Sequence, residues 1–352
     1  MTRKRFLESL VAFVMMTMLM IIPVTVHAAS SGFSVQPITS KAQRDKSESY
    51  FDVIVKPNQS TDLKVKLVNR TKQAIQVKVA VHSGETNDNG MVDYSGLQKK
   101  DNTLRYDLSQ YLKGPKKVTV PANSQQIYTA KLTMPENQLP GLMAGGFTFS
   151  PMNYSTATKK SAKLSITNRF SYGIAVVTRN QDRTWQPQLK IGQATVTQQQ
   201  AKNAIAVPMH NVKATFLNQL KVNVTATNNR THKVYKRTAD AMQMAPNSHF
   251  TYQVRLPNNV TAGRYLVNTT AYYVKDQTGQ YTDSTGTHYK YKTTNTSDVI
   301  VTAKQSKDLQ QRAKQARGGT PWFIYAIIAL VVVLLIIIGT LVTLLIKKRS
   351  KK

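Results

Sequence analysis

The chain has 352 residues, which is enough for more than one ordinary domain. It contains no cysteine, so disulfides, thiolate metal sites and a cysteine nucleophile are excluded. Lys and Arg number 48 against 17 Asp and Glu, and the resulting net charge of +31 favours polyanionic partners.

Residues 1–28 are typical of a secretory signal peptide. Basic residues at positions 3–5 precede an apolar run from Leu10 to Ile22, and small residues follow it up to Ala28. The run is short for a membrane span and is broken by Pro23. We therefore expect cleavage after Ala28 and export of the chain that follows.

The next region, up to residue 302, consists of short segments in which apolar and polar residues alternate. Leu63, Val65 and Leu67 alternate with lysines, and the segment from Ile75 to Val81 repeats the pattern. Pro, Asn and Gly separate such segments, and no long amphipathic helix interrupts them. This pattern predicts an all-β fold built from antiparallel β-sandwiches.

An internal repeat indicates two tandem sandwiches. Ser124, Tyr128 and Leu132 are spaced by four residues, and so are Ser248, Tyr252 and Leu256. Upstream, residues 69–71 (Asn-Arg-Thr) have an apparent counterpart at residues 229–231. Chance similarity between β-rich segments is the alternative explanation.

The periodicity breaks at residues 151–163, which places a domain boundary there. We therefore predict one sandwich over residues 29–152 and a second over residues 162–302. The alternative is a long hairpin, in which residues 164–177 still pair with the sheet of the first domain.

The composition after Val301 changes to Ala, Lys, Gln and Arg, which favours a helical, basic stalk over residues 303–320. Residues 321–346 carry no charge and predict one transmembrane helix. Trp322 and Tyr325 are the expected interfacial anchors at its outer end. The basic tail, residues 347–352, starts with Lys347, Lys348 and Arg349 and is expected in the cytoplasm. The expected location is thus the cell membrane, as a single-pass protein with its N-terminal part outside the cell.

Several short motifs together resemble the WxL-interacting protein family. They are FSVQP at 33–37, YFDV at 50–53, VNRT at 68–71, TNDNG at 86–90, VPA at 120–122, MP at 134–135 and GGF at 145–147. Their order, together with the leader, stalk, membrane span and tail, is similar to the architecture of that family. The resemblance implies two immunoglobulin-like domains, a peptidoglycan-binding domain from residue 33 to about 150 and a domain that binds host and WxL proteins over about 162–302.

This resemblance implies a scaffold or adhesin at the Gram-positive cell wall. Its implied partners are peptidoglycan, WxL-domain surface proteins and host extracellular-matrix proteins. No motif of the family assigns individual binding residues.

No catalytic pattern is present in the exported chain, so we expect neither an enzyme nor a cofactor or metal. Its histidines form no HExxH pair, and we interpret each of them as solvated or in a turn; they are His82, His210, His232, His249 and His288. A wall-cleaving glycosidase needs two facing carboxylates. No spacing pairs the available ones, which include Asp45, Glu48, Asp52, Glu85, Asp93, Asp107 and Glu136. A wall hydrolase with an unrecognised acidic site and a surface-assembly chaperone that exchanges strands remain as alternatives.

Two glycine-containing segments have structural interpretations. Asp88, Asn89 and Gly90 suit a tight turn better than a calcium loop, because the spacing and the closing Glu of such a loop are absent. Gly145 and Gly146 are not followed by a predicted helix, so a bend or bulge with close backbone packing is expected rather than a phosphate cradle.

Three lysine pairs in predicted loops are candidate contacts for teichoic-acid phosphate or another anionic wall polymer. They are Lys99 and Lys100, Lys116 and Lys117, and Lys159 and Lys160. Ordinary solvated loop charge is the alternative for each pair. Nucleic acid is not expected as a partner, because the leader directs the chain out of the cell.

Overall fold

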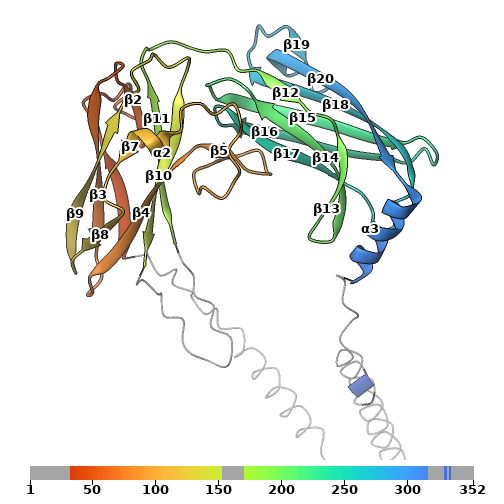
Figure 1. The fold of residues 1–352 in the computed structure, drawn as a ribbon, viewed down its shortest axis with the longest axis horizontal. Coiled ribbons are helices and arrows are strands. Elements are labelled where there is room, and N and C mark those ends of the chain that lie inside the picture. Colours follow the sequence, from red (N-terminus) through yellow and green to blue (C-terminus); the bar gives the residue numbers. More distant parts are fainter. Residues whose placement is uncertain (1–31, 153–169, 316–328, 331–332, 334–352) are drawn as a thin grey trace, which may run out of the picture.

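The computed structural model describes residues 32–152, 170–315, 329–330 and 333 of the chain. Two β-sandwiches lie side by side in it (Figure 1), which confirms the prediction of a mostly β protein. No helix within these residues is long and apolar enough to cross a membrane. The predicted signal peptide, almost all of the predicted transmembrane helix and the basic tail lie outside the described residues.

The first sandwich consists of two facing sheets. One has the order β1-β3-β9-β7, with β1 Phe33–Ile38, β3 Ser60–Asn69, β9 Ser124–Thr133 and β7 Leu112–Lys113. The other has the order β2-β11-β10-β4-β8, with β2 Phe51–Ile54, β11 Tyr172–Arg179, β10 Met143–Pro151, β4 Ile75–Ser83 and β8 Lys117–Val120. Every pairing is antiparallel except that of β2 with β11, which is parallel. The sequence had predicted a purely antiparallel sandwich, and the parallel pairing shows that this part of the prediction is wrong.

The predicted alternation of apolar and polar residues is present in β3 and determines which face of the strand packs on the core. Leu63, Val65 and Leu67 are fully buried, whereas Lys64 is exposed on the opposite face. Successive side chains of a strand point to opposite faces, so one face of β3 contributes to the apolar core and the other meets water.

The second sandwich repeats this arrangement. In its first sheet, β14 Lys202–Asn211 pairs with β12 Leu189–Ile191, β13 Thr195–Gln199 and β17 Ser248–Arg255. Its second sheet has the order β16-β15-β18-β20-β19, with β16 Val234–Met244, β15 Leu217–Asn228, β18 Gly263–Lys275, β20 His288–Val301 and β19 Tyr281–Thr282.

Corresponding strands of the two sandwiches show that the internal repeat is structural. β9 and β17 hold equivalent places beside β3 and β14, and Ser124 lies opposite Asn69 as Ser248 lies opposite Asn211. The turns before β9 and β17 each contain a left-handed Asn, Asn123 at φ 47° and Asn247 at φ 49°. The counterpart of Asn69 is thus Asn211, and the predicted counterpart at 229–231 is wrong because that segment follows β15, the equivalent of β4.

The boundary between the sandwiches differs from the predicted one at residues 151–163. β11 pairs with both β10 and β2, so residues 172–179 complete a sheet of the first sandwich. The long-hairpin alternative is therefore correct in its pairing, and the chain passes to the second sandwich only after Arg179.

Gly145 and Gly146 lie in the middle of β10, in unbroken register with both neighbouring strands. The predicted bend or bulge is therefore wrong, but the close packing is confirmed. A Cβ on Gly145 would lie 2.2 Å from the backbone oxygen of His82, and one on Gly146 would lie 2.8 Å from that of Ile174. Neither site leaves room for a side chain.

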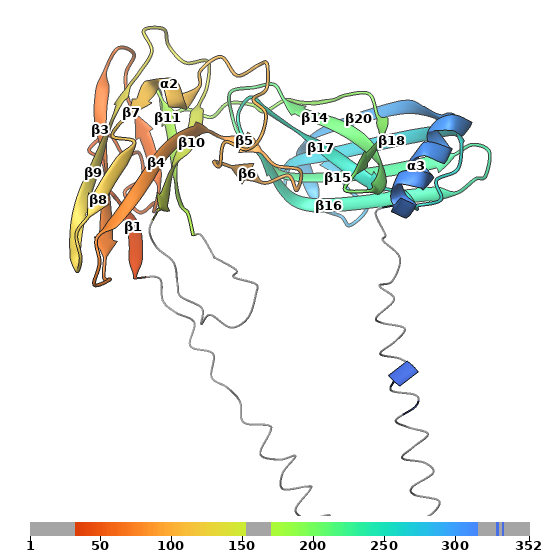
Figure 2. The same cartoon turned by 60° about the horizontal axis from the view of Figure 1, so that its bottom comes forward.

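Helix α3, Ala303–Gln315, occupies most of the predicted stalk, but it packs along the second sandwich (Figure 2). Ser306 and Ala313 are buried, and the Ser306 hydroxyl donates a 2.7 Å hydrogen bond to the Val260 carbonyl. Gln198 donates from its side chain to the Leu309 carbonyl. This segment therefore belongs to the second domain and is not a free spacer.

Candidate functional site

A small hairpin of the first sandwich extends toward the second, and we call residues 84–93 the junction hairpin (Figures 1 and 2). It contains β5 Glu85–Thr86 and β6 Val92–Asp93. Its turn is closed by the side-chain oxygen of Asn87, which accepts from the backbone N–H groups of Asn89 and Met91. Gly90 has a φ of 71°. The tight-turn interpretation of this segment is thereby confirmed.

The junction hairpin docks on β16 and β17 through buried polar contacts. The hydroxyls of Thr86 and Ser248 are 2.6 Å apart, and the Ala245 N–H donates to Thr86 Oγ1 at 3.1 Å. At the turn, the Gln243 N–H donates to the Gly90 carbonyl at 2.8 Å. Both Thr86 and Ser248 are almost fully buried. Because these groups are withdrawn from water, each depends on its partner across the junction.

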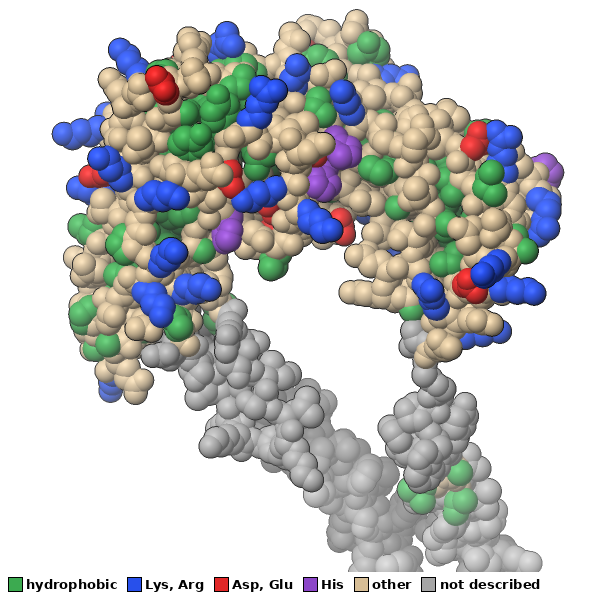
Figure 3. Space-filling view, in the orientation of Figure 1, with side chains coloured by type: hydrophobic (Ala, Val, Ile, Leu, Met, Phe, Trp, Pro, Cys, Tyr) green, Lys and Arg blue, Asp and Glu red, His purple; other side chains and the backbone are tan. Residues whose placement is uncertain are grey.

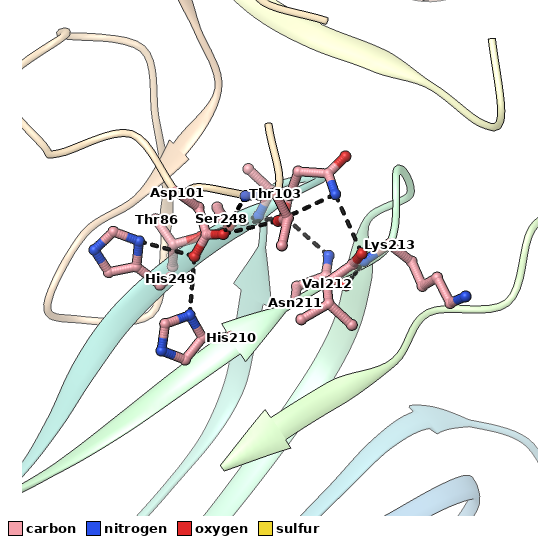
Figure 4. Close-up of polar contacts among 11 residues, drawn as sticks. Thr86, Asp101, Thr103, His210, Asn211, Val212, Lys213, Ser248 and His249 are labelled. Carbon is pink, nitrogen blue, oxygen red and sulfur yellow. Dashed lines mark hydrogen bonds and ion pairs between the residues drawn. The ribbon is translucent and has the colours of Figure 1, made fainter. Parts of the chain in front are cut away.

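Next to this contact, two histidines meet a carboxylate of the first sandwich (Figure 4). His210 on β14 and His249 on β17 are directly opposite in the strand register, with their rings stacked 5.4 Å apart. The Oδ2 atom of Asp101 lies 2.9 Å from Nδ1 of His210 and 3.1 Å from Nδ1 of His249. Histidine side chains also gather at the surface where the sandwiches meet (Figure 3). We call these three residues the His–Asp cluster.

The carboxylate of Asp101 is held in place by its own loop. Its Oδ1 atom accepts from both the backbone N–H and the hydroxyl of Thr103. Burial opposes ionisation of Asp101, but the hydrogen bonds from Thr103 and from His210 outweigh it and lower the pKa of this carboxyl. Asp101 is therefore an anion with one oxygen committed to its loop and the other directed at the two imidazoles.

A basic cleft of about 530 Å³ lies beside the turn of the junction hairpin. It is lined by Asp88, Asn89, Gln199, Lys236, Arg237, Gln253 and Arg255. Among these described lining residues, three are cationic and one is anionic. Arg237 is fixed by a hydrogen bond from Nη1 to the Gln253 carbonyl and by its position 4.4 Å from the centre of the Tyr252 ring. An ordered guanidinium of this kind suits the carboxylate or phosphate of a partner.

Family models match both parts of the chain in sequence. Residues 33–151 match the peptidoglycan binding domain of the WxL Interacting Protein family, and residues 161–311 match its host binding domain. The chain belongs to the WxL-interacting protein family. The resemblance found in the motifs is thereby confirmed, and both matched domains are named for binding rather than for catalysis.

No curated protein matches the chain in sequence. Solved structures to which the chain is distantly similar include a chaperone–tip adhesin complex of CFA/I fimbriae, with 11% identity over 75% of this chain and 98% of that chain and a TM-score of 0.31. The chaperone DraB of E. coli has 12% identity over 76% of this chain and 99% of its own, with a TM-score of 0.27. These similarities are too distant to bear on function.

In this WxL-interacting protein, the boundary between the two sandwiches differs from the boundary between the two family models. The host binding domain model starts at residue 161, whereas β11 belongs to the first sandwich. That model ends at residue 311, within α3, which agrees with the docking of this helix on the second sandwich.

The predicted lysine contacts of this family member are only partly described. Lys99 is exposed, whereas Lys100 forms an ion pair with Asp107. Lys116 and Lys117 are not in an open loop, because Lys117 starts β8 and the Lys116 carbonyl accepts from the Val79 N–H. Other predicted residues lie outside the described part of the chain: Lys159, Lys160, Trp322, Tyr325, Lys347, Lys348 and Arg349.

The carboxylates considered for a wall hydrolase are mostly engaged elsewhere. Asp52 binds Arg179 at 2.5 Å, and Asp107 accepts from Ser83, Ser109 and Lys100. Asp45 and Asp93 accept from neighbouring serines. Glu48 and Glu136 are exposed. Glu85 differs from all of these, because it is buried, burial raises its pKa, and its Oε2 makes no hydrogen bond within the described residues.

The His–Asp cluster was missed by the sequence analysis, which interpreted His210 and His249 as solvated or turn residues. Both lie in paired strands, and their side chains are only 37% and 31% exposed. Asp101 comes from a loop more than one hundred residues earlier. The register of β14 against β17 brings the three together, and no local spacing could have shown it.

Proposed function

We propose that this chain is a non-catalytic scaffold of the Gram-positive cell surface. In this proposal the first sandwich binds peptidoglycan, and the second holds WxL-type surface proteins and, as an adhesin, host matrix proteins. The observation that carries it is the succession of a peptidoglycan binding domain and a host binding domain in one chain. The immunoglobulin-like character of both domains is part of the same proposal.

The junction supports a scaffold in which the two binding units are held together. Buried hydrogen bonds join Thr86 to Ser248 and Ala245, and the backbone of Leu142 donates to that of Ala214 at 2.6 Å. Contacts of this kind oppose independent movement of the sandwiches. A partner held by the second sandwich therefore keeps a defined distance from wall bound by the first.

The ends of the chain complete the proposal. A cleaved leader at residues 1–28 exports the protein, and a transmembrane helix at residues 321–346 keeps it at the membrane. The positive charge of the chain favours teichoic acid as an additional wall ligand. The basic cleft provides a place on the second sandwich for an acidic group of a bound protein.

A retention assay tests the division of labour. The protein comprising residues 29–315 is mixed with purified peptidoglycan, with or without teichoic acid, at low and at high salt. We expect salt-resistant retention on stripped peptidoglycan and co-retention of an added WxL-domain protein only when this chain is present. Loss of all retention on stripping or at high salt would mean attraction by charge alone.

Charge variants separate specific binding from general basicity. Changing Lys99, Lys116 and Lys117 to Gln removes three charges from the first sandwich. The matched control changes Lys190, Lys202 and Lys233 to Gln on the second, all of which are exposed. If these lysines contact teichoic acid, only the first set should weaken retention on unstripped wall. The same incubations test the hydrolase alternative, because a hydrolase would release reducing ends from the wall. Adding an unfolded client protein tests the chaperone alternative, because a chaperone would bind that client transiently.

A further inference from the structure

The His–Asp cluster combines donors that suit a transition-metal ion. Two imidazole nitrogens and one carboxylate oxygen form a three-ligand set of the kind found in zinc sites with one open position. Imidazole is a poor ligand for Ca²⁺ and Mg²⁺, which prefer oxygen. The ligand atoms of Asp101, His210 and His249 all lie within 4.8 Å of one another.

The spacing of these atoms fits a tetrahedral ion. With metal–ligand distances of about 2.1 Å, neighbouring ligand atoms of a tetrahedral zinc site are about 3.4 Å apart. Asp101 Oδ2 lies 2.9 Å from one Nδ1 and 3.1 Å from the other. Separations this close to the tetrahedral value need only small shifts of exposed ring edges to admit an ion.

A second observation points to a ligand. The Nδ1 atom of His249 is buried and lies 3.1 Å from Asp101 Oδ2, yet the geometry of this close contact is not that of a hydrogen bond, and the atom makes none with any other described residue. Asp101 Oδ2 is already bonded to His210, and Oδ1 is bonded to Thr103. A buried nitrogen without a hydrogen bond is costly, and coordination of a metal ion by its lone pair would remove that cost.

The ligands are presented by well-supported elements. His210 and His249 lie opposite each other on paired strands, so the sheet fixes their separation. The Asp101 loop is tied to the second sandwich by Asn247, whose side chain donates to Thr103 Oγ1 at 3.3 Å. The imidazoles remain about one-third exposed, which leaves an entry path and a fourth position for water or another ligand.

From these observations we propose that Asp101, His210 and His249 form a zinc site that ties the two sandwiches together. Asp101 belongs to the first sandwich and both histidines belong to the second, so a bound ion crosses the junction. Binding stabilises the joined arrangement, because the three ligands meet only when the sandwiches are in contact.

Metal titration of the full chain, purified in a mild non-ionic detergent and freed of metal, tests the site. We expect isothermal titration with Zn²⁺ to give one ion per chain, and Co²⁺ to give the absorption spectrum of a tetrahedral nitrogen–oxygen site. Zinc at about one hundred times its Kd should raise Tm by about 5 °C. It should also slow amide exchange in the Asp101 loop and in β14 and β17. Ca²⁺ and Mg²⁺ should not compete.

Single variants decide whether this cluster is the site. Asp101→Asn, His210→Gln and His249→Gln should each weaken zinc binding at least tenfold, while His232→Asn, at an exposed turn histidine, should not. If Asp101→Asn fails to fold, the two histidine variants still test whether the cluster binds zinc, because both side chains are partly exposed. Absence of stoichiometric binding by the unmodified chain, or binding that survives both histidine variants, would overturn the proposal in favour of a hydrogen-bonded cluster.

Discussion

Asn69 and Asn211 hold the same position in the two sandwiches. Each is the last residue of its strand, is buried, and uses its side-chain amide to donate to the turn before the neighbouring strand. Asn69 donates to the carbonyls of Val120 and Pro121, and Asn211 donates to that of Ala245. The repeated fold thus carries a repeated polar anchor in addition to its repeated apolar pattern.

Removal of this anchor should destabilise the first sandwich. Asn69→Ala leaves buried backbone carbonyls without donors, and we expect the free energy of unfolding to fall by about 3 kcal/mol. Urea denaturation followed by circular dichroism measures the change. Asn137→Ala, at an exposed position, is the control and should stay near the unmodified value. Equal stability of the two variants would contradict the role of Asn69.

Gly145 should not tolerate even one added methyl group. A Cβ there would meet the backbone oxygen of His82, and the surrounding strands cannot move apart without loss of their hydrogen bonds. We expect Gly145→Ala to yield little folded protein. Gly173→Ala, on the adjacent β11, is the matched control, since its Cβ would meet nothing closer than 4.0 Å. The two variants are compared by their soluble yield and by thermal unfolding. A stable Gly145→Ala variant would show that the strands around Gly145 pack less tightly than described.

Asp107 should make the protein sensitive to acid. Burial opposes its ionisation, but hydrogen bonds from Lys100, Ser109 and Ser83 outweigh burial and lower the pKa of Asp107 to about 2. Since this value is below the ordinary pKa of about 3.9, the ionised side chain stabilises the fold fully above that pH and progressively less as the pH falls toward 2.

The variant Asp107→Asn should therefore flatten the dependence of unfolding free energy on pH over this range, in addition to lowering stability at neutral pH. Denaturation at a series of pH values gives both quantities. Asp62→Asn, at an exposed position, should leave the slope as it is. An unchanged slope in Asp107→Asn would assign the acid sensitivity to other groups.

Thr86 should couple the unfolding of the two sandwiches. Replacement by Val keeps the shape but removes the hydroxyl that contacts Ser248 and accepts from Ala245. We expect the free energy that couples the unfolding of the two sandwiches to fall by about 1–3 kcal/mol. Calorimetry should then show two unfolding transitions where the unmodified protein shows one. Thr133→Val, at an exposed position on β9, is the control. A single transition at an unchanged temperature would show that the junction does not depend on this contact.

Strand-level features were predictable from the sequence, because their signals are local. The alternation at Leu63, Val65 and Leu67 fixed one face of β3, and the spacing from Ser124 and from Ser248 identified equivalent strands. The matching motifs identified the family for the same reason.

Long-range features were harder to predict. The addition of β11 to the first sandwich was only the alternative prediction, because it depends on pairing across residues 153–169, which interrupt the alternation. The docking of α3 uses Ser306 and Ala313, small residues that give no apolar stripe. Asp101 meets His210 and His249 only through tertiary structure, and a single sequence contains no spacing that reports it.

The docked helix also determines how mechanical load enters the protein. A pull on the chain beyond Gln315 first acts on α3, whose contacts with Val260 and Gln198 must break before tension reaches the end of β20 at Val301. These few contacts are weaker than the long ladder between β18 and β20. Under a pulling force, helix α3 should therefore detach and extend before either sandwich unfolds. The chain would lengthen while both sandwiches stay folded and keep their bound partners.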